Sequence, residues 1–368
     1  MQLQEVTRFG IPERLVTVWR EQQGDRLLPV QRQVIRKGLL GHNAHEQGRS
    51  FVICAPTSSG KSFCAELAAA AALARRQKVI MLFPLKALAE EKYRRLKTVF
   101  GGLGLSCLIA TADHPENDAL LLRGRFDLAV AIYEKLDLLL AARLDLLTNV
   151  GLVVVDELQM IAEPGRGVVL ERLLTRLRAS HFSPQVLGLS AVVGDESGRQ
   201  LADWLGGELI EEATRPVELL RGVAANGSLR YRSFNSGCDG TEPFTMAGEE
   251  DGDLADLLLR RLKQDDGPTL VFLKSRHDTV RCAVRLAAQV NHPPATTCLE
   301  QLRDEEPSFL VRSLRQVLSR GVAFHNADLS MRQRDIIEQG FINKEISTII
   351  STTTLAMGIN LPADTVYL

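Results

Sequence analysis

The sequence lacks the features that mark several specialised classes of protein. Its six cysteines form no C-x-x-C pair and have no metal-ligand spacing, which disfavours a zinc site or a disulfide framework. The N-terminal segment has no basic flank followed by an apolar run, so we expect no signal peptide. The most apolar windows, such as residues 136–147, carry charges and are too short to cross a membrane. These absences predict a cytoplasmic protein with reduced thiols and no membrane partner.

The chain also lacks an excess of either charge. Its 44 basic and 45 acidic residues give a formal net charge of −1, so overall charge points to no polyanionic partner. A local basic groove is compatible with this balance, because net charge averages over all faces. Hydrophobic residues make up 45% of the 368, which is typical of a globular protein, and the length predicts two domains.

Short apolar runs alternate with longer amphipathic stretches in the first half of the chain. Buried strands that alternate with helices form parallel sheets covered by helices on both faces, so the pattern predicts an α/β fold. The expected strands are residues 50–54, 78–83, 128–132, 152–155 and 185–189, and the expected helices are 62–76, 85–100, 133–147 and 168–179.

The alternation stops within residues 214–253, which are rich in glycine and acidic residues. We interpret them as a linker and irregular entry segment, with part of a hairpin at 231–234. This predicts domains at 1–213 and 254–368, the second incomplete because its last expected strand, 365–368, meets the chain end. The other expected elements of the second domain are strands 269–273, 321–324 and 347–351 and helices 254–263, 278–290, 307–320 and 330–343.

The strongest motif is Ala-Pro-Thr-Ser-Ser-Gly-Lys-Ser at residues 55–62, between an expected strand and an expected helix. This context predicts a P-loop, in which backbone N–H groups and the helix dipole converge on phosphates. Gly60 allows close approach, Lys61 would reach the β- and γ-phosphates, and Ser62 would bind Mg²⁺. A serine- and glycine-rich turn with an incidental lysine is the disfavoured alternative. The rest of the predicted nucleotide-binding loop is Pro56, Thr57, Ser58 and Ser59.

Two acidic residues follow the strand expected at residues 152–155, at the end where α/β sheets place their sites. Asp156 would hold Mg²⁺, and Glu157 would polarise the attacking water as a general base. Alone, such a pair is a weak signal, because acidic residues often begin helices. Downstream of a P-loop it predicts a catalytic site that uses ATP and Mg²⁺.

With these motifs in place, the sequence resembles the superfamily-2 helicases. It is most similar to their Ski-like branch, which includes archaeal DNA-repair helicases and RNA-exosome helicases, and the resemblance runs over nearly the whole chain. It implies two RecA-like domains, each a mainly parallel sheet with helices on both faces. The matching segments are 28–31 (Q motif), 84–93 (Ia), 133–135 (Ib), 156–159 (II), 189–194 (III), 270–276 (IV) and 352–362 (V).

The resemblance also implies roles for individual residues. Gln31 would read the adenine edge, and Gly358 and Asn360 would lie near the nucleotide. Ser190 and Ala191 would couple hydrolysis to strand binding. Taken singly, the lysines among the implied strand contacts could be solvated helix charges, and the histidine could be an interior residue. The implied contacts to nucleic acid are Lys86, Lys135, Arg276, His325, Thr352 and Thr353.

The sequence departs from the pattern of the branch at four points. Gln159 replaces a histidine in motif II, so it can form hydrogen bonds but cannot become charged. Val192 replaces a threonine in motif III, and Asp328 replaces a small residue. Motif VI, which carries arginine fingers, would follow Leu368, so we expect this chain alone to bind ATP but hydrolyse it slowly.

The resulting hypothesis is a monomeric motor that couples ATP hydrolysis to movement along single-stranded or partly duplex nucleic acid and to unwinding. Its catalytic residues would be Lys61, Asp156, Glu157 and Gln159. The resemblance favours DNA over RNA and 3′ to 5′ movement. Two alternatives are an RNA helicase and an ATP-gated clamp or scaffold that does not unwind. A kinase or GTPase is disfavoured, because it would leave the second RecA-like half unexplained.

Overall fold

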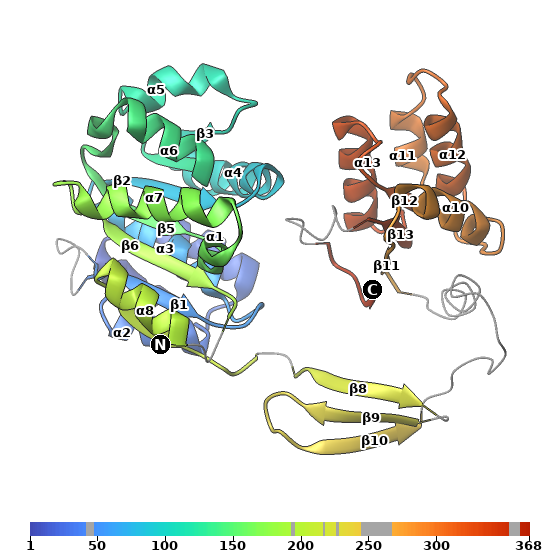
Figure 1. Cartoon of the computed structure of the whole chain (residues 1–368), viewed down its shortest axis with the longest axis horizontal. Coiled ribbons are helices and arrows are strands. Elements are labelled where there is room, and N and C mark those ends of the chain that lie inside the picture. Colours follow the sequence, from blue (N-terminus) through green and yellow to red (C-terminus); the bar gives the residue numbers. More distant parts are fainter. Residues whose placement is uncertain (42–47, 193–195, 216–217, 226–227, 244–266, 353–360) are drawn as a thin grey trace. The chain divides into compact units, whose positions relative to one another are not determined.

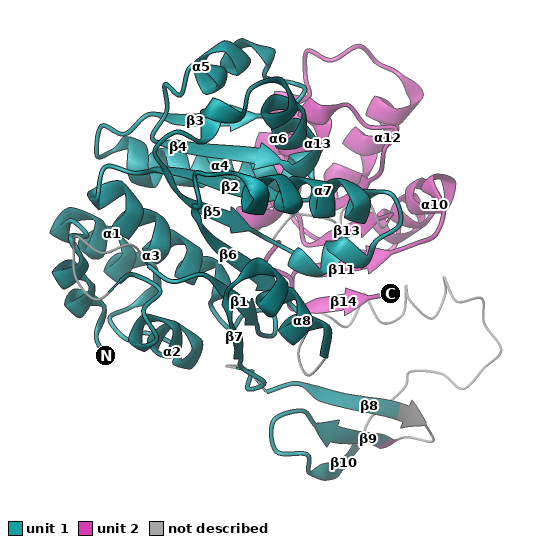
Figure 2. Ribbon diagram, turned by 60° about the vertical axis from the view of Figure 1, so that its left-hand side comes forward, with its two compact units in different colours: residues 1–223, 229–242 teal, residues 224–228, 243–368 magenta. Residues whose placement is uncertain are grey.

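The structure divides into two compact units. It is a computed structural model that describes residues 1–41, 48–192, 196–215, 218–225, 228–243, 267–352 and 361–368 (Figure 1). The first unit comprises residues 1–223 and 229–242, and the second comprises 224–228 and 243–368 (Figure 2). The domain limits expected from the sequence, at 213 and 254, stay a prediction.

A seven-stranded sheet forms the centre of the first unit. Its strand order is β3-β4-β2-β5-β6-β1-β7, and every pair of neighbours is parallel. The apolar runs of these strands are almost entirely buried, as expected for a parallel sheet covered on both faces. The strands are β1 Phe51–Cys54, β2 Lys78–Phe83, β3 Cys107–Ala110, β4 Leu128–Ile132, β5 Val150–Val155, β6 Gln185–Ser190 and β7 Glu208–Glu211.

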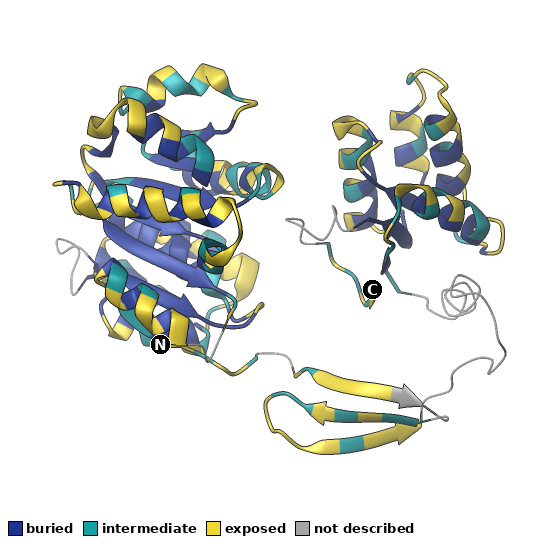
Figure 3. Cartoon of the chain, viewed as in Figure 1, coloured by how far each residue is buried: buried dark blue, intermediate teal, exposed yellow. Residues whose placement is uncertain are grey.

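Helices cover the two faces of this sheet with separate apolar clusters (Figure 3). Because side chains alternate along a strand, Val154 of β5 joins one cluster while Val153 and Val155 join the other. Helices α1 Glu13–Gln23, α2 Pro29–Arg36, α3 Lys61–Ala74 and α4 Lys86–Gly101 supply the first cluster. Helices α5 Asp118–Leu122, α6 Tyr133–Ala142, α7 Arg166–Ala179 and α8 Glu196–Leu205 supply the second.

Short 3₁₀ helices complete the unit and account for one difference from the sequence analysis. The helix expected at 133–147 is divided, because the backbone of Arg143 is extended (φ −156°) and ends α6. The edge strands β3 and β7 are additional to the strands expected from the sequence. The 3₁₀ helices are η1 Leu3–Phe9, η2 Pro115–Asn117, η3 Leu144–Leu147 and η4 Leu158–Ala162.

The second unit has a four-stranded sheet of its own, in the order β12-β13-β11-β14, with parallel neighbours. Its core centres on Phe324 and Phe341, both fully buried. Both sheets confirm the expected α/β fold of RecA-like type. The strands are β11 Thr269–Phe272, β12 Val322–His325, β13 Thr348–Ser351 and β14 Thr365–Tyr367, and the helices are α10 Arg276–Ala287, α11 Thr296–Gln301, α12 Phe309–Leu318 and α13 Met331–Ile342.

A small three-stranded sheet replaces the single hairpin expected within the linker. It consists of β8 Leu220–Ala225, β9 Ser228–Ser233 and β10 Asp239–Pro243, with β9 in the middle. The helix expected at 254–263 lies outside the described residues. None of the helices that the structure describes is both long and apolar enough to cross a bilayer.

The separate cores predict separate responses to core mutations. Phe324→Ala should destabilise the second unit by ~3–5 kcal/mol, because it removes a fully buried aromatic ring. Both tryptophans, Trp19 and Trp204, belong to the first unit, so tryptophan fluorescence reports on that unit alone. In urea unfolding, Phe324→Ala should shift the circular-dichroism transition but leave the fluorescence transition in place. Phe100→Ala, equally buried in the first unit, should shift the fluorescence transition; equal fluorescence shifts in both variants would contradict separate cores.

Candidate nucleotide site and strand-binding residues

The P-loop connects the end of β1 to the start of α3 and contains one position that only glycine fits. Gly60 has φ +89°, in the left-handed region, and it caps the N-terminus of α3. A Cβ atom at this position would lie 2.3 Å from Nε2 of Gln31 and 2.8 Å from Cδ1 of Leu28. Gly60 is therefore required both by its own conformation and by the close approach of α2.

The side chain of Gln31, on α2, supports this loop by a hydrogen bond to its backbone. Its side chain is buried, its Oε1 accepts a hydrogen bond from the Leu28 amide at 2.8 Å, and its Nε2 donates to the Gly60 carbonyl at 3.2 Å. A primary amide has two N–H donors and two acceptor lone pairs, so Gln31 keeps one of each. The expected adenine contact stays a prediction, and no sequence pattern indicated the bond to the P-loop.

The polar groups of the loop fit a chain of phosphates. The Lys61 amine donates to the carbonyls of Ala55 at 2.9 Å and Pro56 at 3.3 Å. Burial lowers the pKa of Lys61, and the charges of Glu157 and Asp156 oppose this effect. Among the described residues, Ser59 Oγ is buried without a hydrogen-bond partner. A phosphate would give the lysine an anionic partner and the serine an acceptor.

The predicted catalytic carboxylates directly follow β5. Asp156 is 9% exposed, and desolvation followed by the charge of Glu157 raises the pKa of its carboxyl to about 6. Glu157 adopts a left-handed conformation (φ +52°), which is strained for any residue except glycine. Ser62 and Asp156, the two predicted Mg²⁺ ligands, line the same cavity. Mg²⁺ is commonly held by one or two protein groups together with substrate phosphates, so Ser62 and Asp156 stay its predicted ligands.

Gln159 connects the second motif to the third. Its Nε2 donates to Oε2 of Glu157, and its Oε1 accepts a hydrogen bond from the Ala191 amide at 3.4 Å. Ser190 ends β6, and its hydroxyl accepts a bond from the Val192 amide at 3.2 Å. The glutamine that departs from the branch pattern therefore makes a neutral bridge between the predicted general base and the predicted coupling segment.

Two further side chains that the sequence analysis did not single out connect the motifs. The buried hydroxyl of Tyr133, at the start of α6, donates to the Asp156 carbonyl. Arg166, at the start of α7, donates to the Pro84 carbonyl at 3.0 Å and lies 3.6 Å from Glu134. Tyr133 stands within the predicted motif Ib, so its position was a signal, whereas nothing in the sequence marked Arg166.

The predicted strand-binding cations are each paired with a carboxylate. Lys86 bonds Asp113 at 2.8 Å, and Lys135, 12% exposed, bonds Asp118 at 2.5 Å. In the second unit, Arg276 pairs with Asp328, the residue that departs from the branch pattern. The pairs of Lys86 and Arg276 are exposed, and exposed pairs are worth little in water, so phosphates could displace their carboxylates.

The remaining predicted strand contacts that the structure describes are buried. His325 is 3% exposed, and its Nε2 lies 3.1 Å from Oε1 of Glu338, which matches the interior-histidine alternative. Thr352 is also buried. We therefore assign neither residue a phosphate contact. Thr353, Gly358 and Asn360 lie outside the described residues.

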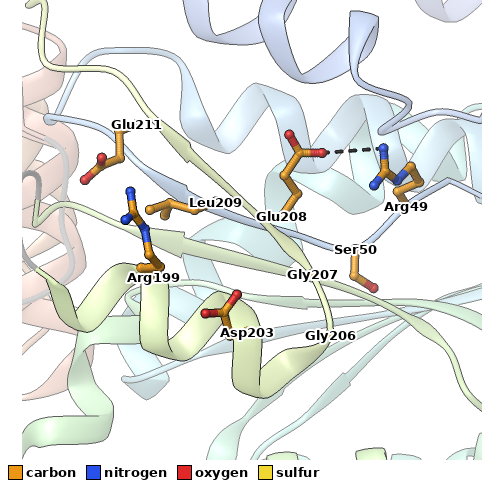
Figure 4. Close-up of a pocket in the computed structure, with 9 residues that line it drawn as sticks. All are labelled: Arg49, Ser50, Arg199, Asp203, Gly206, Gly207, Glu208, Leu209 and Glu211. Atoms are coloured by element: carbon orange, nitrogen blue, oxygen red, sulfur yellow. Dashed lines mark ion pairs between the residues drawn. The ribbon is translucent and has the colours of Figure 1, made fainter.

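A separate polar hollow lies beside the edge strand β7 and has no link to the P-loop chemistry (Figure 4). Arg49 pairs with Glu208 at 3.5 Å across its rim. Two arginines and three carboxylates line it, so charges of both signs are mixed and none converge on one point. This arrangement does not define a ligand class.

The fold and the site together define a P-loop nucleotide-binding protein of RecA-like architecture. Residues 28–199 match the family of DEAD/DEAH box helicases. This match and the relatives described below confirm the resemblance to the superfamily-2 helicases.

Individual relatives extend the likeness over most of the chain. The ATP-dependent DNA helicase Hel308 of Pyrobaculum calidifontis is 37% identical over 98% of this chain and 49% of its own length. The Hel308 of Caldivirga maquilingensis is 35% identical over 92% of the chain and 43% of its own length, and that of Pyrococcus horikoshii is 34% identical over 98% and 47%. The chain thus spans about half the length of the curated relatives it matches.

The glycine geometry of the P-loop predicts a loss of nucleotide affinity. Gly60→Ala should weaken binding of a fluorescent ATP analogue about tenfold or more, because the left-handed conformation costs alanine ~1–2 kcal/mol and the methyl group displaces Gln31. Gly104→Ala is the matched control, since Gly104 has φ +79° with no atom within 4 Å of a Cβ. Equal affinities for the two variants would contradict the bracing role of Gln31.

Burial of Asp156 predicts that the catalytic carboxylate destabilises the metal-free protein. Its folded pKa is about 6 against an ordinary 3.8, so the penalty is full above pH 6, fades as pH falls, and vanishes below pH 3.8. Asp156→Asn should abolish ATP hydrolysis yet raise the free energy of unfolding at pH 8 by up to ~3 kcal/mol.

Urea unfolding in EDTA at pH 8 and pH 4.5 measures this effect. The gain should shrink at the lower pH. Asp137→Asn is the control, because this buried carboxylate bonds Arg172 and lies 3.3 Å from Arg176, and its loss should destabilise the protein. Destabilisation by Asp156→Asn at pH 8 would show that its neighbours compensate the charge.

Proposed function

We propose that this protein is an ATP-dependent DNA helicase that moves along single-stranded DNA and separates duplexes. The observation that carries the proposal is the hydrogen-bonded chain that joins Asp156 and Glu157 to both Tyr133 and Ala191. These residues belong to the catalytic, strand-binding and coupling motifs. A phosphoryl-transfer site alone needs no such connection, whereas a motor does.

The residues of the first unit would divide the chemistry among them. Lys61, Ser59 and the loop amides would bind the phosphates of ATP and orient them. Ser62 and Asp156 would hold Mg²⁺, which neutralises charge on the transferred phosphoryl group. Glu157 would orient the attacking water and accept its proton.

Gln159 provides a physical route from hydrolysis to the strand. Because its amide bonds both Glu157 and Ala191, a change at the predicted general base alters the bonding of the predicted coupling segment. The grip on the strand would come from Lys86, Lys135 and Arg276 after phosphates replace their carboxylate partners. Such binding depends strongly on salt and little on sequence.

DNA is proposed over RNA because the similar proteins are DNA helicases by name, and the 3′ to 5′ direction rests on the resemblance to the Ski-like branch. A second candidate function is an ATP-gated clamp that binds strands without separating them. One observation favours it: Val192 stands where the branch has threonine, so the coupling segment lacks a hydroxyl.

The test is the ATPase rate of the full-length encoded protein with single-stranded DNA, single-stranded RNA or neither, with Lys61→Ala as the blank. We expect DNA to stimulate hydrolysis at least about tenfold, because strand binding completes the motor. A strand-displacement assay on a duplex with a 3′ tail follows. Stimulation by RNA alone would overturn the choice of DNA, and stimulation without displacement would favour the clamp.

A further inference from the structure

One buried carboxylate of the first unit has no role in the chemistry described above. Glu66 lies on α3, one helical turn beyond Ser62, and is 4% exposed. Its two oxygens bond the guanidinium of Arg95 on α4, at 2.5 and 3.2 Å. This bidentate geometry holds the P-loop helix and α4 in one fixed arrangement.

A second cation of α4 lies where this pair meets the nucleotide site. Ser62, Glu66, Lys92, Arg95 and Asp156 line one cavity between α3, α4 and the end of β5. The positive charge of Lys92 lowers the pKa of both Glu66 and Asp156, against the larger effect of burial. Lys92 therefore lines the same cavity as a carboxylate of α3 and the predicted Mg²⁺ ligand, while its amine pairs with Glu91 at 3.4 Å.

The same helix begins at a predicted strand contact. Helix α4 spans Lys86–Gly101, so Lys86 stands at its first turn and Lys92 and Arg95 follow two turns later. An α-helix transmits a displacement along its axis because its hydrogen bonds make it stiff. A shift of Lys92 or Arg95 would therefore move Lys86 as well.

Stability alone gives a weak reason for a charge pair at this position. A buried ion pair pays a desolvation penalty that its attraction often fails to recover, and apolar replacements are frequently as stable. Burial indeed raises the pKa of Glu66 despite Arg95. The apolar neighbours of the cavity, Met81, Phe83 and Leu96, show that hydrophobic packing is available there.

We propose that Glu66, Lys92 and Arg95, here named the α3–α4 charge cluster, position α4 against the P-loop helix so that the nucleotide site sets the position of Lys86 on the strand. The three act as positioning residues and are distinct from the predicted phosphate-binding loop and the predicted Mg²⁺ ligands. The proposal rests on the proposed function, because it assigns the route by which ATP and nucleic acid influence each other.

The first unit contains a matched pair for comparison. Asp137 on α6 is also 4% exposed, and it bonds Arg172 of α7. Asp137 lines neither the cavity nor the P-loop. Asp137→Asn therefore reproduces the loss of a buried ion pair without touching the α3–α4 charge cluster.

The experiment compares Glu66→Gln, Arg95→Gln, the double variant and Asp137→Asn in the full-length protein. Three quantities are measured: the Tm, the Kd of a fluorescent ATP analogue, and the stimulation of ATP hydrolysis by single-stranded DNA. We expect each single cluster variant to lose about fivefold or more of the stimulation, the lower range of coupling between sites. The Kd of the nucleotide analogue should change less than about threefold, because no residue of the cluster belongs to the predicted phosphate-binding loop.

The double variant and the control separate positioning from stability. Neutralising both partners removes the unpaired buried charge, so the double variant should recover much of the lost Tm but none of the lost stimulation. Asp137→Asn should lower the Tm and keep the stimulation. Recovery of stimulation together with Tm in the double variant, or equal loss of stimulation in Asp137→Asn, would overturn the proposal.

The stimulation of the unmodified protein separates a failure of the cluster proposal from a failure of the proposed function. If it is stimulated by DNA and the cluster variants are stimulated equally, the α3–α4 charge cluster has no positioning role while the proposed function stands. If no nucleic acid stimulates the unmodified protein, the motor and the cluster proposal both fail.

Discussion

The buried carboxylate of Asp156, at the end of a central strand, constrains much of the first unit. A carboxylate that is 9% exposed loses most of its hydration, and here the nearby positive charges offset only part of that loss, so its pKa stays raised. The charges of Lys92 on α4 and Lys61 in the P-loop lower the pKa of this carboxyl, while the hydroxyl of Tyr133 donates to the carbonyl of the same residue. Segments far apart in the sequence therefore meet at one strand end, which is also where the predicted chemistry takes place.

The residue after Asp156 has a strained backbone, which costs stability but fixes the position of the predicted general base. Glu157 remains in a left-handed conformation because its amide donates to Oδ1 of Asp156 at 3.1 Å and Gln159 holds its carboxylate. Gly60 adopts a similar conformation without strain, since it has no side chain. The site thus contains two left-handed residues: Gly60 adopts this conformation freely, whereas Glu157 is held in it by hydrogen bonds to its neighbours.

A net charge close to zero is compatible with a polyanionic substrate when the cations that would contact it are paired with carboxylates. Lys86, Lys135 and Arg276 are each paired with a carboxylate, so the predicted strand contacts coexist with a net charge of −1. The pairing of Arg276 with Asp328 also explains one departure from the branch pattern, because the aspartate supplies the partner.

The sequence by itself determined the α/β class, the P-loop and the carboxylates after β5, because local patterns encode buried strands and phosphate-binding turns. It did not determine the edge strands β3 and β7; β7 has only one buried residue, so it lacks the continuous apolar run of the central strands. Only the tertiary structure decided that Gln31 braces Gly60, that Gln159 joins Glu157 to Ala191, and that His325 is buried. It also brought Glu66 to Arg95. The physical reason is that a motif records residue types along the chain, whereas hydrogen bonds and ion pairs depend on which strands and helices pack side by side.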